Sequence, residues 1–378
     1  MTIDVGRNDL GGAGGRRGFP RRRLRALAGL GLAIGVIVVT VVELLPSERH
    51  VTVVRVVVPA DDPRPTRSTG QGSAALPLAP TPQQAAAAAA ATRQTSAGMP
   101  RPAGVSAPSS TPRLLAAGAR ASFQRLDESL PGRVELAVSP LGAGATTVLG
   151  GDVAAHGWST TKVPVLVSLL RVRGEAGLTT QERVWASAAI TASDNQSILD
   201  LFGDLEQLRG GLVPASDYID SVLRLSGDSE TVVATAPPPA GAVTTFGQTE
   251  WSPSEALKFF RGLARGCLLP GTQTNYVLDL MQNIESSESW GLGSGHFGVP
   301  VAFKGGWGPE PSGRYLVRQS GVIDVGSSRG VAVAIVAFPS EGGSGSFAAG
   351  TQMLTETSQW LQRELRLTPR PSVGCPTP

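Results

Sequence analysis

Three short polar segments, far apart in the chain, restrict its possible folds more than any other feature: Ser159–Lys162, Ser193–Asn195 and Lys304–Gly306. The first opens a long apolar run, the second separates two helix-like stretches, and the third ends a strand-like stretch. On a helix, residues three apart share a face, so Ser159 and Lys162 would come within hydrogen-bond reach. A fold that uses all three segments must bring a helix start, a turn and a strand end together.

The residue types in these segments suit nucleophilic chemistry. A serine hydroxyl attacks poorly at neutral pH, so it needs a base that takes its proton. Lysine can be that base when burial and a second cation lower its pKa. Ser159 and Lys162 form the candidate pair and Lys304 the second cation, while Ser193 suits a proton relay and Asn195 suits a hydrogen bond to a substrate amide.

With their flanking residues, these motifs carry a resemblance to a known family. Trp158–Pro164, Ala189–Asn195 and Ala302–Pro309 resemble the S-x-x-K, S-D-N and K-T-G signatures of the penicillin-recognising serine hydrolases, in the same order. The chain is most similar to the class A β-lactamase-like group, as a divergent actinobacterial branch. The resemblance spans about residues 114–368.

The resemblance implies a mechanism. Ser159 would be the nucleophile and Lys162 its general base, with the oxyanion held between the backbone N–H groups of Ser159 and Trp307. Ser193 and Lys304 would pass the proton to the leaving nitrogen. The implied substrate is a β-lactam or a D-alanyl peptide of the cell wall, and neither a metal nor an organic cofactor is implied.

The third motif departs from the family pattern. Gly305 stands where the family has a hydroxyl residue, which removes a hydrogen bond to a substrate carboxylate. Gly305 and Gly306 remain candidate substrate-binding residues. Arg314 is a further candidate, because its planar guanidinium could hold a carboxylate. A simple surface arginine is the alternative interpretation of Arg314.

A second departure concerns release of the acyl-enzyme. The E-x-x-L-N loop, whose glutamate activates the hydrolytic water in class A enzymes, does not occur after Asn195. Glu230 is a weak candidate for that base. Without such a base the acyl-enzyme would be long-lived, so the alternative function is a catalytically weak or inactive penicillin-binding or sensor protein. The gap between Ser159 and Ser193 is also shorter than in typical class A enzymes, which predicts a reduced helical subdomain.

Other interpretations of the polar residues are structural. Ser159 would suit a helix N-cap, and Ser193–Asn195 would suit a turn. The three histidines are scattered, and Gly326–Gly330, a G-x-S-x-G match, links two strand-like stretches and is better explained as a hairpin turn than as a nucleophile elbow. Three tryptophans could line the site or belong to the core: Trp251, Trp290 and Trp307.

The N-terminal part differs in composition from the rest. Residues 1–25 carry seven arginines and two aspartates, and we expect them to form a cytoplasmic basic tail. The apolar residues 26–45 are long enough to cross a bilayer, so we expect one transmembrane helix and an extracytoplasmic domain at the cell membrane. A cleaved signal peptide is the alternative, but no small-x-small site follows. Residues 46–112, rich in Pro, Ala and Ser, predict a linker.

The remaining charge and the cysteines add two inferences. Outside the basic tail the chain is nearly neutral, so nothing suggests a nucleic-acid partner. The only cysteines are Cys267 and Cys375, which either form a disulfide in an oxidising compartment or remain free thiols.

The hydrophobic patterns predict an α+β fold over residues 113–368, followed by a tail at 369–378. The resemblance implies that this fold is of the β-lactamase/transpeptidase type. We expect an antiparallel sheet with the terminal helices on one face and a reduced all-helical subdomain beside it. Predicted helices are 113–130, one from about 159, 181–191, 196–208, 215–225, 253–265, 272–285 and 347–365; predicted strands are 134–138, 146–149, 299–303, 315–324 and 330–338.

Overall fold

A computed structural model describes residues 112–340 and 346–376. The chain divides into two units, Met1–Gly98 and Met99–Pro378, and all described residues belong to the second. The predicted basic tail, the transmembrane helix and nearly all of the linker lie outside the described residues. Among the described helices, none combines the length and hydrophobicity that crossing a membrane requires.

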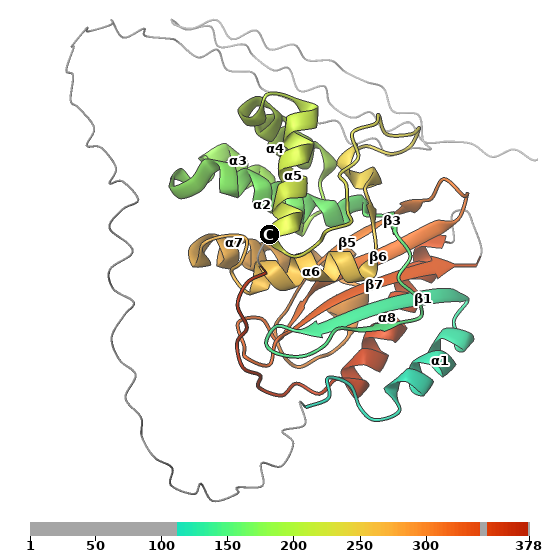
Figure 1. The fold of residues 1–378 in the computed structure, drawn as a ribbon. Coiled ribbons are helices and arrows are strands. Elements are labelled where there is room, and N and C mark those ends of the chain that lie inside the picture. Colours follow the sequence, from blue (N-terminus) through green and yellow to red (C-terminus); the bar gives the residue numbers. More distant parts are fainter. Residues whose placement is uncertain (1–111, 341–345, 377–378) are drawn as a thin grey trace, which may run out of the picture. The chain divides into compact units, whose positions relative to one another are not determined.

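Five antiparallel strands form the main sheet, in the order β2-β1-β7-β6-β5 (Figure 1). Their bounds are β1 Gly132–Pro140, β2 Thr147–Leu149, β5 Val301–Pro309, β6 Tyr315–Ile323 and β7 Val331–Pro339. A second sheet pairs β3 (Ala155–His156) with β4 (Glu250–Trp251). The main sheet therefore ends at β5, which pairs only with β6.

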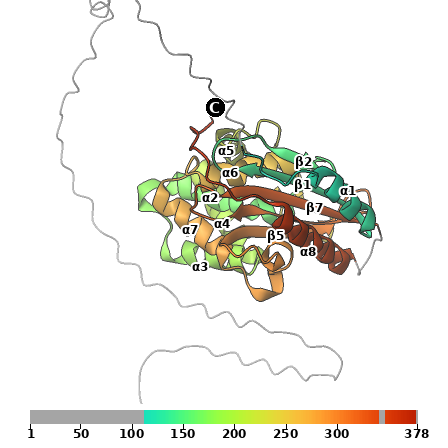
Figure 2. The same ribbon diagram turned by 90° about the horizontal axis from the view of Figure 1, so that it is seen from below.

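Two helices cover one face of this sheet, α1 (Ala119–Ser129) and α8 (Ser346–Glu364), as Figures 1 and 2 show. Apolar side chains of the strands, including Val134, Val317 and Ile335, pack there against Phe123 and Trp360. The predicted terminal helices on one face are confirmed. The first helix was predicted to begin at residue 113, which is wrong: Gly118 has a left-handed φ of 84° and Leu115 pairs with Leu365 instead.

The other face carries the helical part of the domain. Its helices are α2 Lys162–Arg173, α3 Thr180–Thr191, α4 Asn195–Arg209, α5 Leu212–Leu225, α6 Pro253–Ala264 and α7 Gly271–Gln282. Helix α2 lies at the centre, and every residue from Lys162 to Leu170 is buried. A helix that is apolar on all sides must be enclosed by other elements, which explains why the helix that begins beside Ser159 is buried.

The C-terminal tail packs against this domain. Arg370 is buried and donates hydrogen bonds to the carbonyl oxygens of Ala143 (3.2 Å) and Pro112 (2.6 Å). A disulfide joins Cys375 to Cys267, just after α6, across 108 residues of sequence. Of the two alternatives for these cysteines, the structure has the bridge.

Candidate active site

The nucleophile candidate lies in a short 3₁₀ helix, Trp158–Thr161, that runs directly into α2. Three consecutive hydroxyl residues occur here, and their environments differ. Thr160 Oγ1 donates to the carbonyl of Gly157, and Thr161 Oγ1 donates to the carbonyl of Trp158 over 2.6 Å. Ser159 is half-buried, and its hydroxyl has no hydrogen-bond partner in the described part of the chain. Ser159 is therefore the one of the three that is open to an incoming group.

The ammonium of Lys162 is almost completely buried. It donates to the backbone carbonyl of Ser193 and, over 2.9 Å, to Oδ1 of Asn195, and it lies 3.4 Å from Ser193 Oγ. No hydrogen bond joins it to Ser159 Oγ within the residues described, although the two residues are neighbours on one helical turn. Hydrogen bonds of catalytic groups are often absent without substrate and form in the complex.

The turn at Ser193–Asn195 is built by two local features. Ser193 has a left-handed φ of 57°, which is unusual for a residue with a side chain. Asp194 is the N-cap of α4, and its carboxylate accepts a 2.7 Å hydrogen bond from the backbone N–H of Ser197. Hydrogen bonding from the backbone and the side chain of Ser197 lowers the pKa of Asp194. The cap fixes the turn, so that Ser193 and Asn195 both face Lys162.

Lys304 approaches the same turn from the sheet. It lies inside β5, not at a strand end as predicted, because β6 pairs with β5 as far as Pro309. Its fully buried ammonium donates to Ser193 Oγ (2.8 Å), Glu288 Oε2 (3.2 Å) and the carbonyl of Gly305 (3.1 Å). The Ser193 hydroxyl thus links the two lysines.

Burial and neighbouring charges change the proton affinity of the two lysines. Burial first, and the positive charge of Lys304 second, lower the pKa of Lys162 to about 7, against the opposing effects of Glu288 and Asp194. Burial also lowers the pKa of Lys304, although its ion pair with Glu288 opposes that change. A lysine with a pKa near neutrality can accept a proton at physiological pH.

The glycines of β5 allow the strand to approach the nucleophile. A Cβ atom at Gly306 would lie 2.8 Å from the backbone N of Ser159 and 3.0 Å from that of Thr160. Only glycine fits so close to backbone atoms. The backbone of Ser159 therefore lies directly against β5, one residue before Trp307.

The Trp307 ring itself packs away from Ser159. It contacts Phe347 of α8 at 5.0 Å and Trp290 at 6.0 Å between ring centroids. Trp290 also fills the space beside Gly305, where a Cβ atom would lie 2.9 Å from its Cη2. Trp251 is a buried core residue of β4 and is not part of this group.

Two predicted site residues lie elsewhere. Arg314 is exposed on the turn between β5 and β6, where its Nε contacts Ser312 Oγ at 3.4 Å and its guanidinium lies 6.0 Å from the ring of Phe338. Glu230 is exposed and lines a cavity of about 530 Å³ with His156 and Glu255. That cavity includes neither Ser159 nor either lysine. Neither Arg314 nor Glu230 is brought together with the serine–lysine group.

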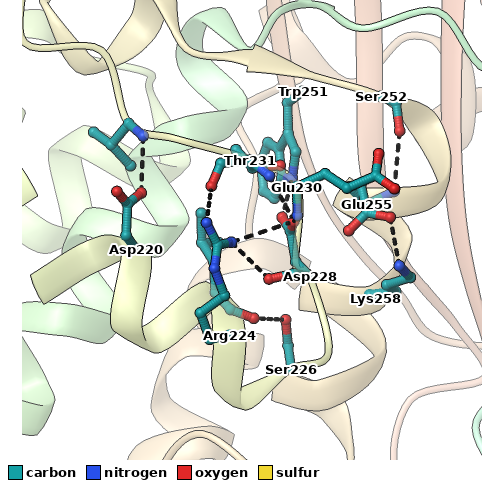
Figure 3. Close-up of polar contacts among 12 residues, drawn as sticks. Asp220, Arg224, Ser226, Asp228, Glu230, Thr231, Trp251, Ser252, Glu255 and Lys258 are labelled. Carbon is teal, nitrogen blue, oxygen red and sulfur yellow. Dashed lines mark hydrogen bonds and ion pairs between the residues drawn. The ribbon is translucent and has the colours of Figure 1, made fainter. Parts of the chain in front are cut away.

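Figure 3 shows the surroundings of Glu230. The buried carboxylate of Asp228 accepts hydrogen bonds from Trp251 Nε1 (3.0 Å) and from the backbone N–H groups of Thr231 (3.0 Å) and Glu230 (3.2 Å). Burial and the neighbouring Asp228 raise the pKa of Glu255 to about 7, and the pKa of Asp228 is lowered. Glu255 is therefore the member of this pair that holds a proton.

Solved structures share this arrangement of elements. A β-lactamase from Chitinophaga pinensis aligns with a TM-score of 0.52 at 18% identity, over 65% of this chain and 99% of that one. TLA-1 extended-spectrum β-lactamase aligns with 0.51 at 14% identity, over 65% and 98%. The protein named PBP-A gives 0.50 at 19% identity, over 65% and 96%. The described domain has the fold of the penicillin-recognising serine hydrolases. No family model and no curated protein matches the sequence.

Sequence reasoning missed two residues of the described domain that contact the candidate site or the segment leading into it. Glu288 lies 16 residues before Lys304 and ends a three-residue 3₁₀ helix, Ser286–Glu288, and no periodic pattern in the sequence links the two residues. Arg318 is fully buried in β6, and its Nη1 donates to the carbonyl oxygens of Ala155 (3.1 Å), His156 (3.1 Å) and Trp251 (3.0 Å). Arg318 thus anchors the segment that leads into Ser159.

Proposed function

We propose that this protein is a membrane-anchored, extracytoplasmic serine hydrolase that forms an acyl-enzyme on Ser159. The observation that carries the proposal is the convergence of two buried lysines on the Ser193 hydroxyl, next to the one unpaired hydroxyl of Trp158–Thr161. The candidate substrates are β-lactams and D-alanyl peptides of the cell wall. The fold shared with β-lactamases and with PBP-A supports this choice.

The first half of the reaction forms the ester. Neutral Lys162 takes the proton of Ser159 as Oγ attacks the carbonyl carbon. The backbone N–H groups of Ser159 and Trp307 stabilise the oxyanion. When the bond to the leaving nitrogen breaks, Ser193 gives its proton to that nitrogen and regains one from the ammonium of Lys162, which returns Lys162 to its neutral form. Asn195 holds the amide of the acyl group.

The second half hydrolyses the ester. Water attacks the acyl carbon, Lys162 takes the water proton, and Ser159 leaves as the free hydroxyl. Glu230 faces a different cavity, so the proposal assigns no role to it in this step. The predicted anchor at residues 26–45 would place this chemistry next to the cell wall, which predicts that the full chain fractionates with membranes.

The test uses the full chain, purified in detergent, and its Ser159→Ala variant. Both are incubated with benzylpenicillin and with a D-alanyl-D-alanine peptide ester, and intact mass is recorded over time. The expected result is a mass gain of one acyl group in the wild type and none in Ser159→Ala. A Thr160→Ser variant is the control, because its hydroxyl should stay paired with Gly157. Absence of any adduct with these donors and with a reactive phosphonate ester would contradict the proposed function.

A further inference from the structure

The hydrogen bonds of Lys304 leave no donor for a substrate. An ammonium group has three N–H donors. In this structure they meet Ser193 Oγ at 2.8 Å, Gly305 O at 3.1 Å and Glu288 Oε2 at 3.2 Å. A carboxylate on a substrate beside β5 would have to displace one of these acceptors.

The positive charge of Lys304 is also already paired with a carboxylate. Glu288 forms an ion pair with it inside the domain, and Asp194 lies next to Lys162. The two lysines thus face two carboxylates. Among the described residues, no other lysine or arginine side chain donates a hydrogen bond to any of the three motif segments. Arg314 lies on the hairpin turn, against Phe338.

Trp290 closes the position where a hydroxyl group would be expected. A Cβ atom at residue 305 would lie 2.9 Å from Trp290 Cη2 and 3.0 Å from Cζ2, so a serine or threonine there requires the indole to move. Trp290 packs in turn on Trp307 and Phe347, with centroids 6.0 Å away in both cases. This side of β5 therefore offers aromatic surface to an anion in place of a hydroxyl group at residue 305, and the one polar side-chain atom of Trp290, its buried Nε1, has no hydrogen-bond partner among the described residues.

Resting on the proposed function, we propose that the site selects acyl donors whose leaving group carries no free carboxylate, because Glu288 and Trp290 have replaced the anion-binding groups beside Lys304. The substrate class is an ester, or a D-alanyl peptide bond whose following carboxyl group is itself amidated. A D-alanyl peptide bond of this kind lies inside a peptide chain and not at its C-terminal end.

The test compares matched donors that differ only in this carboxylate. Benzylpenicillin is paired with its methyl ester, and an acyl-lysyl-D-alanyl-D-alanine peptide with its C-terminal amide. The rate of Ser159 acylation in the full chain is followed by mass. We expect the neutral member of each pair to react at least about tenfold faster, since a charged group buried without a partner is costly. Faster reaction of the carboxylate members would overturn the inference and leave the proposed function intact.

A triple variant tests the assigned residues. Glu288→Ala, Trp290→Ala and Gly305→Thr together free one donor of Lys304 and introduce a hydroxyl group at residue 305. The preference should move toward the carboxylate members by about tenfold or more. Glu285→Gln, an exposed neighbour of Glu288, is the matched control and should keep the wild-type preference. An unchanged preference in the triple variant contradicts the role of these residues.

A binding measurement tests the preference for neutral donors separately from acylation. In Ser159→Ala, which cannot be acylated at this residue, quenching of tryptophan fluorescence is titrated with each penicillin and its methyl ester. Tighter binding of the ester supports the inference even if no acylation occurs, and such a result would contradict only the proposed function. Tighter binding of the acid, or binding of neither, counts against the inference.

Discussion

Lys304 Nζ lies 2.8 Å from Ser193 Oγ, and this hydrogen bond connects the sheet to the turn that begins α4. The same oxygen is 3.4 Å from Nζ of Lys162. One hydroxyl therefore stands between two buried ammonium groups that would otherwise repel each other. This geometry makes the Ser193 hydroxyl the shortest route for a proton between α2 and β5.

Ser193→Ala should therefore slow acylation of Ser159 by about 10²-fold or more, because the proton relay to the leaving group is lost. Stopped-flow mass or fluorescence measurements with a saturating acyl donor give the rate. Gln196→Ala, on the exposed first turn of α4, should react at the wild-type rate. Equal rates for the two variants would exclude a relay through Ser193.

The acylation rate should depend on the protonation of Lys162. Since the base must be neutral and its pKa is about 7, the rate should rise with pH and level off above about pH 8. The charge of Glu288 raises the pKa of Lys162, so Glu288→Gln should move the midpoint of this profile to lower pH. Glu285→Gln should leave the midpoint in place. A midpoint that shifts upward in Glu288→Gln would contradict this account.

Gly306→Ala should disturb the site because the added Cβ atom would clash with backbone atoms near Ser159. The added Cβ atom would lie 2.8 Å from Ser159 N and 3.0 Å from both Gly157 O and Thr160 N, and none of these atoms can move freely. Overpacking of this kind costs about 1–3 kcal/mol of unfolding free energy. Acylation should slow as well, because the Ser159 N–H is displaced.

The matched control is Gly203→Ala in α4, where a Cβ atom meets nothing within 4 Å. That change should raise stability slightly, since alanine is a better helix former than glycine. Urea unfolding of both variants gives the comparison. A Gly306→Ala protein as stable and as active as Gly203→Ala would show that β5 tolerates a side chain beside Ser159.

The pair Asp228 and Glu255 should make stability depend on pH. Glu255 has its ordinary pKa of 4.5 in the unfolded chain and about 7 in the folded one. Between these values the folded state holds a proton that the unfolded state has lost. The free energy of unfolding should therefore fall as pH rises from about 4.5 to about 7, and the stabilisation is complete only below that range.

Glu255→Gln should remove this dependence, because the amide stays neutral and can still donate toward Asp228. Thermal unfolding at several pH values measures the effect, with Glu250→Gln, exposed on β4, as the control. If the wild type becomes more stable between pH 5 and 7 while Glu255→Gln stays unchanged, the predicted direction of the pH dependence is wrong.

The disulfide should contribute to the stability of the domain. It closes a loop of 108 residues and fixes the tail against the end of α6. Cys375→Ser should lower the free energy of unfolding by about 2–4 kcal/mol. Ser372→Ala in the same tail should have little effect. A reducing agent should lower the unfolding midpoint of the wild type only. If it lowers the midpoint of Cys375→Ser equally, loss of the disulfide does not explain the destabilisation.

The sequence by itself determined the local elements and the order of the motifs. Periodic apolar residues predicted six helices of the helical region within a few residues of their bounds, because periodicity reflects contacts along a single element. It also predicted a helix beginning near Ser159, whereas Ser159 lies in the 3₁₀ helix just before α2, and it placed Ser193 in the turn before α4. These predictions depend on neighbouring residues alone.

Only the tertiary structure decided which partners these residues meet. Glu288 reaches Lys304 from a short 3₁₀ helix, Trp290 covers Gly305, and Arg318 holds the segment before Ser159 from β6. Glu230 and Arg314, plausible by residue type, lie away from the group. Contacts between distant segments follow from how complete elements pack, and no local pattern in the sequence encodes that packing.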